Sequence, residues 1–388
     1  MPQQKIGTRQ AVHSTGPRQV LVLGAYASLR VRDGALDIIH GPYNDKQTLR
    51  IDIDASPKPH TILFDSHGEF LTGEALRWCA RYGIGLALPD GPGRILTFLQ
   101  SGLEASEGAS ELVDIDPAVI KAQCRVAEHA PAKAGVAREI VRAKIEAEAS
   151  HASERDPHSA NAVAECLAAL DTADSVPQLM TIEAHAAMAY WRAFRDMGLR
   201  EAKNGNLPRT WLRFANRQKG AQFLGSKHAS HPINAMLNYA YVVEAGRLAK
   251  ALAARGFALQ IGFLHADKKG RNSLVWDAIE PLRPAITARV FAYIASREFA
   301  RSDFPQTSAS TFRLARGVIG ELLDRVCLSQ REIAEAADFM LQMIERYAGG
   351  ERSLFKADLR RRKRLIGGSK PVSARYLEKT QATPSLLA

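Results

Sequence analysis

The strongest constraint on the fold is a change of sequence pattern after the first quarter of the chain. Residues 18–97 contain short β-type runs separated by turn signals such as Asp33-Gly34, a pattern typical of strands and hairpins. From about Pro117 almost to the C-terminus, apolar residues instead recur at helical spacing. This change predicts an α+β protein in which a small N-terminal β domain is followed by a larger all-α domain.

The pattern divides the chain into four segments. We expect a flexible N-terminus over 1–17, the β domain over 18–115, the helical domain over 116–350 and a basic, flexible tail over 351–388. Strands are predicted at 19–23, 27–31, 49–53, 61–64 and 85–88, with one helix over 72–82. Further helices are predicted at 137–145, 162–170, 178–197, 233–254, 285–299 and 310–326, with a polar loop at 151–157.

Composition excludes several classes of protein. No apolar run reaches the ~20 residues that a membrane-spanning helix needs. The first residues are polar and lack the apolar stretch of a signal peptide, so we expect a cytoplasmic protein that contacts no membrane. The four cysteines stand far apart in sequence, which excludes a CxxC metal or redox pair and favours buried thiols.

Positive charge is concentrated in two places. The net charge is +11, from 52 Lys and Arg against 41 Asp and Glu. Residues 200–227 hold seven basic side chains against one acidic, and residues 351–388 hold ten against three, including the run from Arg360 to Arg364. Clustered positive charge attracts phosphate polyanions, although a solubilising surface explains the charge alone equally well.

Two segments place single polar residues in apolar surroundings. Glu183 lies among small alanines, where a buried carboxylate needs a partner such as a metal ion. A position near a helix start, facing water, is the simpler explanation of that segment by itself. His265 follows the apolar run 261–264; a lone histidine is more often structural than a ligand, yet it can bind a metal or transfer a proton near neutral pH.

A third segment carries Asp277 and Glu280, which are three residues apart and therefore share one face of a helix. Ser273 is a plausible N-cap of this helix, and Pro281 should break or kink it. A solvated acidic face is the alternative explanation, although the neighbouring apolar residues leave that face narrow.

The three segments together supply one imidazole and two or three carboxylates. This hard, oxygen-rich donor set suits Mg²⁺ or Mn²⁺. Such an ion can bind a phosphate oxygen and activate a water or a 3′-hydroxyl. Lys268, Lys269 and Arg271 lie between His265 and Glu280 in sequence, which favours a phosphodiester over a sugar or a peptide as substrate.

Three motifs in a fixed order resemble those of the CRISPR-associated Cas1 family. They are the helix Asn234-Ala-Met-Leu-Asn-Tyr-Ala-Tyr241, then Gly262-Phe-Leu-His265, then Ser273-Leu-Val-Trp-Asp-Ala-Ile-Glu-Pro-Leu-Arg-Pro284. Matches around Ile182-Glu183 and from Ala137 to Ile145 extend the resemblance over most of the chain. The resemblance implies a DNA endonuclease and integrase that depends on a divalent metal and whose helical domain is catalytic.

The resemblance also implies roles for single residues. Glu183, His265 and Glu280 become the metal ligands, and Asp277 becomes an acidic neighbour that orients the catalytic site. Lys144, Tyr190, Arg271 and Ser273 become candidates for positioning DNA. The positive charge of Lys268 and of the stretch 200–227 adds Lys268, Arg209, Arg213 and Arg217 to the candidate DNA contacts.

The same resemblance implies a biological role. Family members insert short foreign DNA, the spacers, into a CRISPR array by attack of a 3′-hydroxyl on a phosphodiester. They dimerise through their β domains, and two dimers bind the small partner Cas2 in a heterohexamer. Two alternatives stay open: a stand-alone relative that serves a mobile element, and a DNA-binding scaffold with an inactive site. The intact set of Glu183, His265, Asp277 and Glu280 argues against the scaffold.

Overall fold

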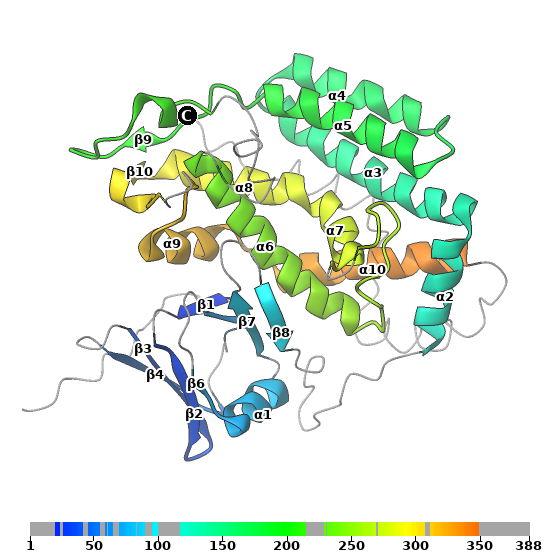
Figure 1. Cartoon of the computed structure of the whole chain (residues 1–388). Helices are drawn as coiled ribbons and strands as arrows, with labels where there is room; N and C mark the ends of the chain where they lie inside the picture. The colour runs from blue at the N-terminus through cyan, green and yellow to red at the C-terminus, as the bar shows by residue number, and fades with distance from the viewer. Residues whose placement is uncertain are drawn as a thin grey trace, which may run out of the picture. The chain divides into compact units, whose positions relative to one another are not determined.

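The computed structural model describes residues 20–23, 26–41, 46–54, 59, 61–64, 70–82, 84–89, 95–99, 117–214, 229, 231–268, 271–306 and 311–348 (Figure 1). Arg217, Lys269, the N-terminal segment 1–17 and the tail 351–388 lie outside these residues. The chain divides into two compact units, residues 1–113 with Ile319–Asp324, and residues 114–318 with 325–388. We describe each unit by itself.

The N-terminal unit contains two sheets. One has the order β1-β5-β7-β8, in which the first three strands are parallel and β8 is antiparallel. The other has the order β4-β3-β2-β6 and is antiparallel except for the pair β2–β6. The strands are β1 (Val20–Leu23), β2 (Ser28–Arg32), β3 (Ala35–His40), β4 (Gln47–Ile51), β5 (Thr61–Phe64), β6 (Phe70–Leu71), β7 (Gly85–Pro89) and β8 (Ile95–Leu99).

Local sequence signals explain much of this unit. Asp33 and Gly34 both have positive φ, 51° and 77°, as a two-residue turn between β2 and β3 requires, so the predicted hairpin is confirmed. The predicted helix is α1 (Gly73–Arg81), and Thr72 caps it by accepting a hydrogen bond from the amide of Ala75. The core between these elements is apolar and includes Leu23, Leu29, Leu36, Ile62, Phe64 and Trp78.

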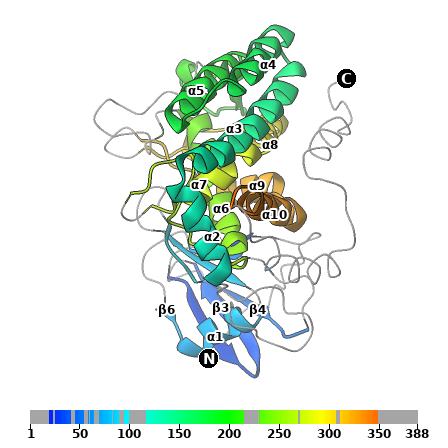
Figure 2. The same cartoon turned by 90° about the vertical axis from the view of Figure 1, so that its right-hand side faces the viewer.

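The second unit is built almost entirely of helices. Figures 1 and 2 show that α3, α4 and α5 pack side by side. The helices are α2 (Pro117–Glu128), α3 (Ala130–Ser153), α4 (Pro157–Leu170), α5 (Val176–Arg192), α6 (Pro232–Ala253), α7 (Ser273–Ile279), α8 (Arg283–Ser296), α9 (Arg316–Val326) and α10 (Gln330–Tyr347). The α+β prediction is therefore confirmed. None of the described helices combines the length and apolar character needed to cross a bilayer.

Several predicted boundaries are wrong. Most of the loop predicted at 151–157 belongs to helices: α3 continues to Ser153, because Ala152 is buried against its neighbours, and α4 starts at Pro157 behind the cap Asp156. The helix predicted at 178–197 ends at Arg192, and the one predicted at 310–326 begins only at Arg316. The end of the helix predicted at 285–299 is instead β10 (Glu298–Phe299), which pairs with β9 (Arg200–Glu201), a distant partner that local patterns cannot reveal.

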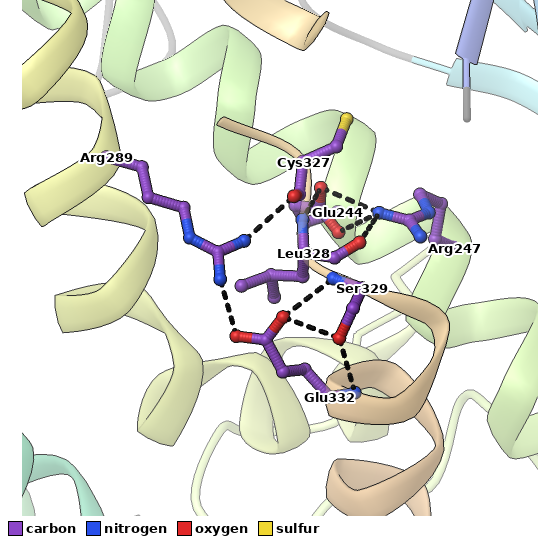
Figure 3. A network of polar contacts seen from close by, with 7 residues as sticks. All are labelled: Glu244, Arg247, Arg289, Cys327, Leu328, Ser329 and Glu332. Carbon is purple, nitrogen blue, oxygen red and sulfur yellow. Dashed lines mark hydrogen bonds and ion pairs between the residues drawn. The ribbon is translucent and has the colours of Figure 1, made fainter. Parts of the chain in front are cut away.

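A network of ion pairs and hydrogen bonds, partly buried, holds the turn between α9 and α10 (Figure 3). Arg247 Nη1 on α6 donates to both carboxylate oxygens of Glu244, at 3.0 and 2.9 Å, and to the carbonyl of Leu328 at 2.7 Å. The amide of Leu328 donates to Glu244 Oε1 at 3.0 Å. From α8, Arg289 donates to the carbonyl of Cys327 at 2.8 Å and to Glu332 at 2.7 Å. The network thereby fixes where α10 begins against α6 and α8.

Replacement of Arg247 by Met should lower the free energy of unfolding by about 3–5 kcal/mol, because Glu244 is then a buried carboxylate without its cation. Urea denaturation of the full chain measures this loss. Arg331→Met, which breaks the more exposed pair with Glu335 on α10, is the matched control and should cost less than about 1 kcal/mol. Equal losses in the two variants would contradict a structural role for the buried pair.

Candidate active site

Three carboxylates surround Lys144 of α3 inside the second unit. Its Nζ atom contacts Glu183 Oε1 of α5 and lies 2.7 Å from Glu280 Oε2, at the corner between α7 and α8. Glu148, one turn further along α3, has its Oε1 atom 4.0 Å from the same nitrogen. Lys144, Glu148 and Glu280 are buried, whereas the side chain of Glu183 is 25% exposed.

The corner that carries Glu280 follows from its sequence. Pro281 has no amide hydrogen to continue an α-helix, so α7 ends at Ile279 and a 3₁₀ turn, Glu280–Leu282, leads into α8. The predicted break at Pro281 is thus confirmed. Arg283, the first residue of α8, brings its Nε atom to 3.0 Å from Glu280 Oε1 in an ion pair that lacks hydrogen-bond alignment. Glu280 therefore faces one cation on each oxygen.

The pKa shifts in this cluster follow from burial and from these contacts. Burial by itself raises the pKa of Glu280, but Arg283 and Lys144 outweigh it and lower that pKa to about 2. Burial lowers the pKa of Lys144, yet Glu280, Glu148 and Glu183 together raise it above its ordinary value. Burial raises the pKa of Glu148 to about 8, because Lys144 compensates only in part. The ammonium of Lys144 and the carboxylate of Glu280 are therefore both charged near neutral pH.

Asp277 fixes the position of His265. This carboxylate is fully buried, and its Oδ2 atom accepts the amides of Phe263 and Leu264 at 2.5 and 3.0 Å. Its Oδ1 atom accepts the amide of His265 at 2.9 Å and lies 2.7 Å from that residue's Nδ1. Because a carboxylate is an acceptor, Nδ1 carries the hydrogen of this contact, and in the neutral form of the ring Nε2 is the nitrogen that has a lone pair for a ligand. The imidazole is 22% exposed and lies near enough to Glu280 to affect its pKa.

The approach of the His265 loop to Asp277 requires a glycine at position 262. A Cβ atom added to Gly262 would lie 2.8 Å from Ser273 Cβ, 2.9 Å from Asp277 Oδ2 and 3.1 Å from the carbonyl oxygen of His265. These distances are shorter than ordinary van der Waals contacts. The glycine of the Gly262–His265 motif therefore permits the hydrogen bonds that orient the histidine.

Three predicted DNA contacts lie in the interior. Lys144 is held by carboxylates, the hydroxyl of Ser273 donates to the carbonyl of Ala266, and the hydroxyl of Tyr190 lies 2.8 Å from His151 Nδ1. Their burial argues against direct contact with DNA. Ser273 is also not the N-cap that its sequence suggests, because Asn272 occupies that position and Ser273 is the first residue of α7.

The other predicted DNA contacts among the described residues are accessible. Arg209, Arg213 and Lys268 are exposed, and Arg271 is partly exposed. Arg213 pairs with Asp196 at 2.9 Å, but both side chains are so exposed that the pair is weak. Sequence reasoning assigned no role to Glu148 or to Arg283. The spacing of four residues between Lys144 and Glu148 was the available signal, because it places both on one face of a helix.

The chemical types of the donor atoms suit a hard divalent cation. Glu183 and Glu280 supply carboxylate oxygens and His265 an imidazole nitrogen, and the contact of both carboxylates with one ammonium shows that they can share a cation. As the side chains stand, no group of three or more His, Cys, Asp or Glu among the described residues is close enough to hold a metal. A metal ion bound by both carboxylates would have to displace the ammonium of Lys144 from between them.

Comparison with known proteins identifies the family. The model of the family of CRISPR associated protein Cas1 matches residues 23–326. The chain belongs to the Cas1 family. The CRISPR-associated endonuclease Cas1 2 of Pyrobaculum aerophilum is 33% identical over 162 residues, which are 42% of this chain and 47% of that relative. A Cas1 protein of Methanobrevibacter ruminantium is 29% identical over 39% of this chain and 41% of its own length. The chain thus matches less than half the length of these curated relatives.

Solved structures support the Cas1 fold. A casposase bound to an integration product matches with a TM-score of 0.66 and 21% identity, over 85% of this chain and 89% of the casposase chain. A Cas1 protein from Thermotoga maritima matches with a TM-score of 0.59 and 16% identity, over 91% of this chain and 99% of its own. A Cas6-RT-Cas1–Cas2 complex matches with a TM-score of 0.61 and 16% identity, over 90% of this chain and 36% of that chain.

Replacement of Gly262 by Ala should lower the free energy of unfolding of this Cas1-family chain by about 1–3 kcal/mol, because the new methyl group overlaps Asp277 and Ser273. Urea denaturation measures the loss. Gly320→Ala on α9 is the control: its Cβ would meet nothing within 4 Å, so a change of less than about 1 kcal/mol, in the stabilising direction, is expected. A Gly262→Ala protein as stable as the parent would show that the loop tolerates the side chain.

Acid should destabilise the ring cluster in which His151 of α3 contacts Tyr190 of α5 and Phe194. His151 lies against the Phe194 ring, with centroids 4.9 Å apart, and burial followed by the charge of Arg155 lowers its pKa from 6.5 to about 4. Between these pH values the unfolded chain takes up a proton that the folded chain excludes. Stability present at neutral pH is therefore lost as the pH falls, by up to about 2 kcal/mol at pH 5.

Denaturation at pH 7 and pH 5 tests this expectation. His151→Gln removes the titrating ring and should reduce the loss between the two pH values. His158→Gln on α4 changes an exposed histidine and serves as the control. The same acid sensitivity in His151→Gln as in the parent would rule out His151 as its source.

Proposed function

We propose that this Cas1-family chain is a metal-dependent DNA endonuclease and integrase that inserts short DNA into a CRISPR array. The observation that carries the proposal is the convergence of Glu183 and Glu280, 97 positions apart in the sequence, on one cationic group, with His265 near enough to Glu280 to affect its pKa. Carboxylates and an imidazole around a cation are the ligand set of divalent-metal phosphodiester chemistry.

In this proposal Glu183, Glu280 and Nε2 of His265 hold Mg²⁺ or Mn²⁺. The ion, when bound, supplies Lewis-acid activation of a phosphate and of the attacking oxygen. Asp277 keeps the imidazole in the tautomer that leaves Nε2 free to bind. Arg283 keeps the carboxylate of Glu280 ionised, so that it remains a ligand near neutral pH.

The reaction joins one DNA end to another strand. A 3′-hydroxyl oxygen of the incoming DNA forms a bond to a phosphorus atom of the repeat, and the bond from that phosphorus to the 3′-oxygen of the repeat strand breaks. The attacking hydroxyl gives up its proton and the departing 3′-oxygen takes one up. Because one phosphodiester bond replaces another, no energy has to be supplied from outside. With water as the nucleophile, the same site cleaves DNA.

Accessible basic residues supply phosphate contacts in the proposed complex. Lys268 and Arg271 follow His265 closely in the chain, and Arg209 and Arg213 lie in the basic stretch 200–227. Such contacts position DNA without reading its sequence. As further partners we propose a second copy of the chain and Cas2, and the solved relatives include a complex that contains Cas1 and Cas2.

Isosteric substitution of the ligands tests the function. Glu183→Gln, Glu280→Gln and His265→Gln should each reduce Mn²⁺-dependent nicking and strand joining by at least about 100-fold, because each removes one ligand. The assay uses a supercoiled plasmid with a CRISPR repeat and short DNA duplexes with free 3′ ends. Glu146→Gln, on α3 but away from Lys144, is the control and should keep full activity.

Three outcomes separate the possibilities. Unchanged nicking and joining in all three ligand variants would reject the assignment of the site. Joining that is equally efficient in plasmids with and without a repeat would favour the stand-alone integrase of a mobile element. DNA binding by the parent chain without any nicking or joining would favour the inactive scaffold.

A further inference from the structure

Lys144 occupies the place between the two carboxylates that a metal would share. Its Nζ atom lies 2.7 Å from Glu280 Oε2 and contacts Glu183 Oε1, so one ammonium bridges a residue of α5 and a residue of the α7–α8 corner. The side chain of Lys144 is 8% exposed. A divalent cation cannot join both carboxylates while a second cation lies between them, because the two like charges repel strongly at that separation in a buried site.

Glu148 offers the displaced ammonium a place to go. It stands one turn from Lys144 on α3, with Oε1 4.0 Å from Nζ, which is too long for a hydrogen bond. Its other oxygen, Oε2, is buried and has no hydrogen-bond partner in the part of the chain that the structure describes. An unsatisfied buried oxygen of a carboxyl group is costly, so it is an unusual feature that calls for an explanation. A rotation of the lysine side chain toward Glu148 would give this oxygen a donor.

We propose that Lys144 is a built-in counter-ion that exchanges with the metal. Without metal its ammonium bridges Glu183 and Glu280; when metal binds, the ammonium turns to Glu148. This inference rests on the proposed function, since it assumes that Glu183 and Glu280 are ligands. It also explains why Lys144 is buried among carboxylates and not on the surface, where its predicted contact with DNA would place it.

The exchange has a consequence for both states of the site. In the metal-free protein the lysine prevents repulsion between Glu183 and Glu280 and keeps three separate elements together. In the metal-bound protein the metal ion would neutralise the two carboxylates instead. The apparent affinity for metal is then reduced by the ammonium that has to be displaced, and it is restored in part by the new contact with Glu148.

The direct test is the position of Nζ in crystals of the full chain soaked with Mn²⁺, which anomalous scattering locates. The expected result is Mn²⁺ between Glu183 and Glu280, with Nζ within hydrogen-bond distance of Glu148. Mn²⁺ at that place with Nζ still bound to Glu280 would overturn the proposal. Because this test uses the parent chain, it does not depend on whether any variant folds.

Calorimetric titration with Mn²⁺ and thermal unfolding with and without Mn²⁺ give a second, independent test. Lys144→Met should bind Mn²⁺ about tenfold more tightly than the parent, and its unfolding midpoint should be lower without metal and rise more when Mn²⁺ is added. Lys121→Met, which removes an exposed lysine of α2, is the matched control and should behave like the parent. Weaker Mn²⁺ binding in Lys144→Met would contradict the exchange.

Glu148→Gln separates exchange from simple charge effects. It should weaken Mn²⁺ binding about tenfold in the parent chain, because an amide still accepts a hydrogen bond but cannot carry the negative charge that pairs with the displaced ammonium, and have no effect in the Lys144→Met background. Glu146→Gln is the control on the same helix. Equal effects of Glu148→Gln in both backgrounds would overturn the exchange. Absence of Mn²⁺ binding in the parent and in every variant would contradict the proposed function itself, and the inference would fail with it.

Discussion

The arrangement of the helical unit around the site depends on the contact of one ammonium with two carboxylates. Glu183 and Glu280 come from parts of the chain that are distant in sequence, and Lys144 comes from a third. A buried carboxylate without a partner is so unfavourable that the helices can pack this closely only if a cation lies between them. The charges therefore determine how near α3, α5 and the α7–α8 corner can approach.

Other buried charges in this unit have a different task. Asp277 is satisfied by three backbone amides and an imidazole, and Glu244 is satisfied by Arg247 and the amide of Leu328. Both fix a loop against a helix, and neither leaves a place for another cation. Lys144 differs from them in our proposal, in which a metal ion takes the place of its ammonium between two carboxylates. The same kind of buried charge thus gives a fixed support in two places and an exchangeable contact in the third.

Local sequence signals predicted the parts of the molecule that neighbours in the chain determine. The Asp33-Gly34 turn and the break at Pro281 depend on backbone geometry within a few residues, and both predictions were confirmed. The extension of α3 through His151 and the short strand at Glu298 were missed, because packing and pairing with distant residues decide them. For the site, residue type suggested which side chains carry the chemistry, whereas the placement of Lys144 between the carboxylates depends on three helices and no motif encodes it. Glu148 was missed although its spacing of four residues from Lys144 was visible in the sequence, because Lys144 itself was expected to contact DNA.

The four predicted catalytic residues differ in how far their side chains are exposed. Asp277 and Glu280 have 0% and 6% of their side chains exposed, whereas His265 and Glu183 have 22% and 25%. The accessible side of the site is therefore formed by the imidazole and by the α5 carboxylate. Lys268 and Arg271 belong to the same loop region as His265 and reach the surface. In the proposed complex, a phosphate bound by these two residues would therefore approach the metal on the side of His265, whereas Arg283 pairs with Glu280 and Asp277 with His265 in the interior.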